Sequence, residues 1–137
     1  MTAKQWLMRA WSIDRELTAL MNAKQEAYER ITSVTAKIKG NTVSGTKDPH
    51  KYEFYVSFTD EIVRKMKELY DVKLEIMNTI GQVNDPKYRA VLTERCINLH
   101  TLEQTAVNLH YSFQHVCRLQ AEAFERAKRF IPKDEIV

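Results

Sequence analysis

Two long rows of apolar residues, spaced three and four positions apart, constrain this chain more than any other feature of its sequence. Such spacing places the residues along one face of an α-helix, and rows of this length are typical of helices packed side by side. The first row follows Trp6 and has one charged member, Lys24. It consists of Ala10, Ile13, Leu17, Leu20, Lys24, Ala27, Ile31, Val34 and Ile38. The second consists of Tyr55, Phe58, Ile62, Lys65, Leu69, Val72, Ile76, Thr79 and Val83.

A polar segment at residues 40–49 separates the two rows and contains two glycines and a proline. It has no apolar periodicity, which indicates that the chain leaves the helix there. Two long helices with so short a connection most simply form an antiparallel hairpin, predicted over residues 1–84. The hairpin is either scaffold alone or an arm for self-association as a dimer, because two helices rarely cover all their apolar surface. The aromatic residues expected at its open end, toward a partner or the connection, are Trp6, Trp11, Tyr52, Phe54 and Tyr55.

The composition limits the classes of function. The formal net charge is only +3, which is too small to imply general binding to nucleic acid or to an anionic membrane. No apolar run approaches the roughly 18 to 20 residues of a membrane span, so no membrane partner is expected. The two cysteines do not make a disulfide framework, and the N-terminus does not resemble a secretory signal. A cytoplasmic protein is therefore expected.

Asp85 and Pro86 mark the start of a second domain, expected over residues 85–137. An N-cap residue followed by proline favours a new helix and a change of chain direction. The helix is short, because its apolar periodicity stops near Asn98. Its apolar face consists of Tyr88, Val91, Leu92, Cys96 and Ile97.

Two further helices follow with a tight connection between them. Thr101 to Gln104 has the form of a capping box, which predicts a helix of about nine residues ending at Leu109. Ser112 then caps a last helix, expected at about residues 112–127. Its inward residues are Val116, Leu119 and Ala123. Short helix, tight turn and longer helix make a helix-turn-helix, so the predicted fold is all-α, with a long coiled-coil-like hairpin followed by a three-helix DNA-binding unit.

The start of the last helix is the expected reading surface for double-stranded DNA. Arginine can pair with guanine and glutamine with adenine in the major groove, while a helix N-terminus and its cap can meet phosphate. Residues 112–130 carry four basic and two acidic side chains, a mild surplus that suits phosphate contact. The expected DNA-binding residues are Thr101, Ser112, Phe113, Gln114, His115, Arg118 and Arg126. No cofactor is expected.

Residues 88–119 resemble region 4 of sigma-70-type factors, the element that reads promoter DNA in that family. The whole chain looks like a family of small proteins from phages and prophages of Gram-positive bacteria. Those proteins have a long helical N-terminal half, a Ser-Gly-Thr connection and a Tyr-Ser-x-x-His-Val-x-Arg-Leu signature, found here at Ser44 to Thr46 and Tyr111 to Leu119. The resemblance implies a prophage-encoded transcription regulator acting in a bacterial host cell, with RNA polymerase as a possible partner.

Three residues depart from the family pattern. Leu102 stands where tryptophan is common, which is a mild change of packing. Thr105 places a hydroxyl in the expected core, where it can donate to a carbonyl one turn earlier. His110 occupies a turn position that often holds glycine, so its backbone is expected in the left-handed region.

Other readings of the same residues are less well supported. Cys96, His100, His110, His115 and Cys117 match no common zinc-finger spacing, so no metal site is expected. The sequence lacks a phosphate-binding glycine loop, a nucleophile elbow and a paired-carboxylate metal motif, so an enzyme is not expected. The alternatives to a transcription regulator are a DNA-packaging component of the small-terminase kind and another helical assembly or interaction protein. No sigma region 2 is recognisable, which favours an accessory regulator over a complete sigma factor.

Overall fold

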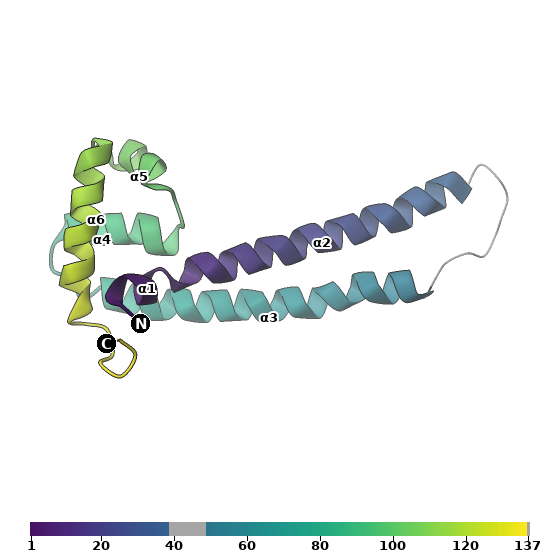
Figure 1. Ribbon diagram of the computed structural model, residues 1–137, viewed down its shortest axis with the longest axis horizontal. Coiled ribbons are helices and arrows are strands. Elements are labelled where there is room, and N and C mark those ends of the chain that lie inside the picture. Colours follow the sequence, from purple (N-terminus) through teal and green to yellow (C-terminus); the bar gives the residue numbers. More distant parts are fainter. Residues whose placement is uncertain (39–48, 137) are drawn as a thin grey trace. The chain divides into compact units, whose positions relative to one another are not determined.

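The computed structural model describes residues 1–38 and 49–136, with the side chains of residues 33–38 left aside. Within this part of the chain all regular structure is helical, which confirms the predicted all-α class. The elements are α1 (Ala3–Leu7), α2 (Arg9–Ile38), α3 (Pro49–Ile80), α4 (Pro86–Leu92), the π-helical turn η1 (Thr93–Ile97), α5 (Leu102–Leu109) and α6 (Phe113–Lys128) (Figure 1). None of these helices is long and apolar enough to cross a membrane. The Ser44–Thr46 connection lies outside the described residues.

The helices belong to two compact units. One is Asp14–Glu68, and the other combines Met1–Ile13 with Leu69–Val137. Sequence patterning places a boundary at residue 85, whereas the structure groups residues 1–13 and 69–84 with the C-terminal helices.

In the unit Asp14–Glu68, α2 and α3 run antiparallel (Figure 1). The first predicted row faces the interior, because Leu17 and Ala27 are buried. An aromatic contact joins the two helices, with the rings of Tyr28 and Tyr55 5.9 Å apart between centroids. The Lys24 ammonium lies 5.4 Å from the centre of the Tyr55 ring, which explains how a lysine is accommodated in the apolar row.

Glu61 and Lys65 stand four residues apart on α3, a spacing that favours an ion pair within one helix, but the structure pairs them with other residues. Lys65 instead contacts Glu16 of α2 at 2.6 Å and Glu68 at 3.0 Å, and hydrogen bonds from these two carboxylates raise the pKa of Lys65. Glu61 pairs with Arg64. Lys65 pairs with Glu16 because the neighbouring antiparallel helix α2 brings this carboxylate close. The rule for pairs four residues apart considers only one helix and cannot predict such a contact.

The N-terminus forms a short helix of its own. The Thr2 hydroxyl accepts the Gln5 backbone N–H at 3.2 Å, and the Gln5 side chain accepts the Thr2 N–H at 2.8 Å, a complete capping box. The predicted continuous helix from Trp6 is therefore broken at Met8, whose φ of −95° and ψ of 11° are not helical. Trp6 is only 2% exposed, so it is a core residue rather than a free aromatic at the hairpin end.

The other unit has its core where the sequence predicts it. The Asp85 carboxylate accepts the Lys87 backbone N–H at 3.0 Å and caps α4. The apolar face of α4 and η1 packs with the inward face of α6. The buried side chains of these elements include Tyr88, Val91, Leu92, Cys96, Val116, Leu119 and Ala123.

The end of the third predicted helix is unusual. Its last turn widens into η1, where the Asn98 N–H donates to the Thr93 carbonyl at 2.9 Å, five residues back. The Thr93 hydroxyl donates to the carbonyl of Arg89 at 2.7 Å. Leu99 then has a φ of 58°, in the left-handed region. Together these features turn the chain toward the start of α5.

Candidate nucleic-acid interface

The turn between α5 and α6 is a Schellman motif. The Tyr111 N–H donates to the Ala106 carbonyl at 3.0 Å and the His110 N–H to the Val107 carbonyl at 3.3 Å. His110 has φ 60° and ψ 40°, which confirms its predicted left-handed backbone. Two orphan carbonyls of α5 are thereby paired, and the chain is redirected into α6 within three residues.

The start of α5 is capped as expected, although only half of the predicted box is present. The Thr101 hydroxyl accepts the Gln104 N–H at 3.1 Å, while the complete box lies at Thr2. Thr105 is fully buried, and its hydroxyl donates to the Thr101 carbonyl at 2.8 Å. The buried Thr105 hydroxyl is thus hydrogen-bonded to a carbonyl one turn earlier, as the sequence predicts.

The first turns of α6 present the side chains expected to read DNA. The Ser112 hydroxyl accepts the His115 N–H at 3.2 Å, which fixes where the helix begins. Gln114 and Arg118 are exposed on the face opposite the buried Val116 and Leu119. Phe113, just after the cap, is 46% exposed.

A chain of contacts orients Arg118. Its Nη2 donates to Nδ1 of His115 at 2.7 Å. Because arginine has no acceptor, Nδ1 of His115 accepts, and the neutral ring carries its proton on Nε2. The His115 ring in turn packs edge-on against Tyr111, with centroids 4.8 Å apart. Tyr111 was not among the predicted site residues, although it is the first residue of the Tyr111–Leu119 signature, which could have identified it.

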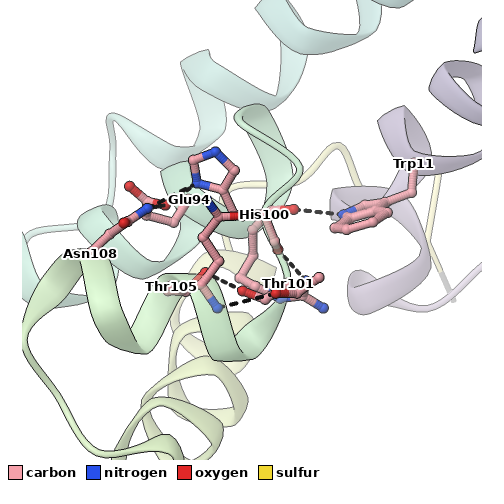
Figure 2. A network of polar contacts seen from close by, with 8 residues as sticks. Trp11, Glu94, His100, Thr101, Thr105 and Asn108 are labelled. Atoms are coloured by element: carbon pink, nitrogen blue, oxygen red, sulfur yellow. Dashed lines mark hydrogen bonds and ion pairs between the residues drawn. The ribbon is translucent and has the colours of Figure 1, made fainter.

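Arg95 of η1 links η1 to α2, to the start of α5 and to α6. Its Nη1 donates to the carbonyl of His100, just before α5, at 2.5 Å, and its Nε donates to Oε1 of Gln120 on α6 at 2.7 Å. Its own carbonyl accepts Nε1–H of Trp11 at 2.6 Å, a contact visible at the right of Figure 2. The start of α5 and the middle of α6 are therefore both anchored to Arg95.

Glu94, His100 and Asn108 form a polar cluster beside this anchor (Figure 2). Asn108 Nδ2 donates to Glu94 at 3.1 Å, and Nδ1 of His100 contacts the same carboxylate oxygen. Burial alone would raise the pKa of Glu94, but the hydrogen bonds from His100 and Asn108 outweigh it, so the pKa lies below its ordinary value. The cluster joins η1 to both ends of α5.

Arg126 lies further along α6, apart from Gln114 and Arg118. Its guanidinium stands 5.1 Å from the centre of the Tyr88 ring. The Tyr88 hydroxyl donates to Glu122 at 2.7 Å, and this hydrogen bond raises the pKa of Tyr88. A shallow groove of about 470 Å³ adjoins this contact, lined by Val83, Asn84, Asp85, Pro86, Tyr88, Arg126, Arg129 and Phe130.

The two cysteines have different surroundings. Cys96 is buried, and burial raises its thiol pKa to about 12, whereas Cys117 is half-buried. Within residues 1–38 and 49–136, no three His, Cys, Asp or Glu side chains are placed to hold one metal ion.

The structure thus brings Ser112, Gln114, His115 and Arg118 together at one end of α6. Thr101 caps the neighbouring helix with its hydroxyl, and Arg126 occupies a separate place beside Tyr88.

A protein-family model matches residues 30–127, and its description is "Protein of unknown function (DUF1492)". Comparisons with curated proteins and with solved structures find no significant match.

Proposed function

Because this chain belongs to the DUF1492 family of proteins of unknown function, its role has to be inferred from its own surface, and we propose that it is a sequence-specific DNA-binding transcription regulator. In this proposal α6 enters the major groove with its N-terminal turns. The regulator would be prophage-encoded and act on double-stranded DNA as a dimer, in keeping with the resemblance of residues 88–119 to sigma region 4.

The observation that carries the proposal is the exposed pair Gln114 and Arg118 on a capped, well-anchored helix. Both side chains project from the face opposite the core, one turn apart. These are the two residue types whose bidentate pairing distinguishes adenine and guanine in the major groove. The Ser112 cap places the helix N-terminus, with its partial positive charge, beside them.

Tyr111 and His115 hold the Arg118 side chain in place, which favours contact with a base over non-specific attraction to the phosphates. A guanidinium held through one Nη2–H to His115 keeps its other N–H groups for a base edge. Holding the side chain in advance reduces the entropy lost when it pairs with a base.

Charge along α6 limits how far the helix enters the groove. Glu122 and Glu125 follow Arg118 on the solvent side, where phosphates would repel them. Reading is therefore assigned to the first two turns. Arg126, stacked on Tyr88, is assigned to the DNA backbone at the edge of the site rather than to a base.

Selection of bound duplexes from a random DNA pool tests the proposal. The full chain is compared with Arg118→Ala and with Arg15→Ala, an exposed arginine of α2 that serves as the matched control. We expect an enriched motif with the full chain and the control, and a loss of about 1 to 3 kcal/mol on that motif with Arg118→Ala. Equal loss on all sequences would make Arg118 a phosphate contact. No enrichment with the full chain would reject the regulator in favour of packaging or protein interaction.

A second variant tests the placement of the recognition helix. Val116 is fully buried, so Val116→Asp places a charge in the core and should unfold the C-terminal helices and abolish binding. A folded, binding Val116→Asp protein would mean that α6 is not positioned as described.

A further inference from the structure

The first residue of α6 has a large apolar side chain that the fold itself does not use. Phe113 follows the Ser112 cap directly and is 46% exposed. It takes no part in the capping, because the Ser112 hydroxyl accepts the His115 N–H, and the apolar residue that supports a cap is the one before it, here Tyr111. Among the residues that the structure describes, no aromatic ring or cation stacks on the Phe113 ring. The ring is therefore available to a molecule bound at the start of α6.

The charges of α6 indicate what kind of molecule that is. The first turn of this helix carries no acidic side chain, and its glutamates, Glu122 and Glu125, follow in its second half. Acidic residues in a first turn stabilise a helix through its dipole, so their absence forgoes stability. A carboxylate at this place would repel a phosphate backbone lying against the helix start. The first turn, apolar and free of negative charge, is thus suited to contact with a polyanion.

We propose that Phe113 recognises the C5 methyl group of a thymine in the major groove of DNA. This inference rests on the proposed function, in which the first turns of α6 enter that groove, and it names one base of the site that α6 reads. Thymine is the base that presents a methyl group in the major groove. A phenyl ring has no hydrogen-bonding group to pair with the polar edge of a base, but it can remove a methyl group from water.

The position of Phe113 in the helix predicts where the thymine lies in the DNA motif. Gln114 is the next residue, so the two side chains leave the helix only about 1.5 Å apart along its axis. Arg118 follows about 7.5 Å beyond Phe113 along the axis, at a rise of about 1.5 Å per residue. With α6 lying along the groove, that distance spans roughly two base-pair steps of about 3.4 Å. The motif should therefore have thymine beside the adenine read by Gln114, and guanine about two base pairs from the thymine.

Selection from two random duplex pools tests the thymine contact. One pool is made with thymine and the other with uracil, which lacks only the C5 methyl group. From the first pool the full chain should enrich a motif with a fixed thymine, and in the second pool the preference at that position should weaken. On the selected duplex, replacing this thymine by uracil should weaken binding by the natural chain about 4-fold, the effect expected of burying one methyl group.

Variants of the full chain assign the methyl effect to Phe113. Phe113→Ala should bind the thymine and uracil duplexes equally, because nothing is left to cover the methyl group. Phe113→Leu keeps an apolar side chain and should retain part of the difference. Val107→Ala, which shortens a 73% exposed apolar side chain of α5, is the matched control and should show the same difference as the natural chain. Circular dichroism checks that all variants remain helical.

The possible outcomes separate this inference from the proposed function. A motif without thymine, or one in which uracil at every thymine leaves the affinity unchanged, would overturn the contact and leave DNA reading by α6 standing. A methyl effect that persists in Phe113→Ala would also overturn it. No motif from either pool would reject the proposed function and the thymine contact together. A methyl effect that Phe113→Ala removes and Val107→Ala keeps would support both.

Discussion

The indole N–H of Trp11 donates to the backbone carbonyl of Arg95 at 2.6 Å, while the Arg95 guanidinium lies 5.1 Å from the centre of the Trp11 ring. One residue of α2 is thereby bound to the turn that supports α5 and α6. Both partners are half-buried, so water replaces this contact poorly when it is lost.

Trp11→Phe keeps an aromatic ring but removes the donor, leaving the Arg95 carbonyl unpaired. We expect the free energy of unfolding to fall by about 1 to 2 kcal/mol, measured by urea denaturation. Tyr52→Phe removes the hydroxyl group of an exposed ring and should change the free energy of unfolding by less than about 0.5 kcal/mol. Equal effects of the two changes would contradict a structural role for the Trp11 bond.

Acid should weaken the Glu94 cluster. The pKa of Glu94 is lower in the folded chain than its ordinary value of 4.5, so the unfolded chain takes up the proton first. The stability that Glu94 contributes is present above about pH 4.5 and is lost as pH falls through the lowered folded pKa. Urea midpoints measured between about pH 7 and about pH 3 should therefore converge for the natural chain and Glu94→Gln. If the difference between the two urea midpoints stayed constant with pH, the lowered pKa of Glu94 would not be the cause of the acid sensitivity. Glu125→Gln, at an exposed site on α6, is the control.

His115→Phe separates orientation of Arg118 from its charge. The ring against Tyr111 is kept, but the acceptor for Arg118 is lost. Affinity for the selected DNA motif should fall by about 1 kcal/mol, less than with Arg118→Ala, while affinity for random DNA should not change. Fluorescence anisotropy on both duplexes measures the two affinities, and a matching loss on random DNA would show that His115 acts by other means.

Alkylation by iodoacetamide should distinguish the two cysteines. Because burial raises the pKa of the Cys96 thiol to about 12, little thiolate exists there at neutral pH, and the sulfur is also shielded from reagent. Mass spectrometry of the native chain should find the label on Cys117 first, with Cys96 labelled only after unfolding in urea. Equal labelling rates in the native state would contradict the packing of η1.

Replacing His110 by glycine should stabilise the turn before α6. A non-glycine residue in the left-handed region costs about 1 to 2 kcal/mol, whereas the extra freedom of glycine in the unfolded chain costs about 0.5 to 1 kcal/mol. We therefore expect His110→Gly to raise the free energy of unfolding by about 0.5 to 1 kcal/mol. His110→Val should lower it, because β-branched residues tolerate a φ of 60° poorly. Thermal melts rank the stabilities of the natural chain, His110→Gly and His110→Val. If His110→Gly were less stable than the natural chain, contacts of the imidazole would contribute more stability than the left-handed backbone of His110 costs.

Local rules were sufficient for much of this fold. The caps at Asp85, Thr101 and Ser112 follow from side-chain chemistry at a helix start, and the structure confirms all three. The buried Val116 and Leu119 follow from helical periodicity. These features depend on neighbours within a few residues, which a single sequence displays.

Other features depend on contacts between distant segments. The π-helical turn at Thr93–Ile97 is held by Arg95 and Glu94 through partners on α2, α5 and α6, and no local pattern announces it. Burial of Trp6 likewise depends on the far end of the chain, where its indole N–H meets the Glu135 carboxylate. The contact of Tyr111 with His115 is local but was also missed, since the residues expected at the start of the last helix were counted only from its cap, Ser112.

The grouping of Met1–Ile13 with Leu69–Val137 has a consequence for how the protein is made. Residues 1–13 are synthesised before residues 69–136 and must wait for them, since the packing partners of Trp11 and Trp6 are Arg95 and Glu135. Residues 14–68, by contrast, are complete while synthesis is still in progress. The unit that contains α6 therefore completes its packing only after Glu135 has been synthesised, so a product that stops before this residue would carry residues 14–68 without the contact that holds Trp6.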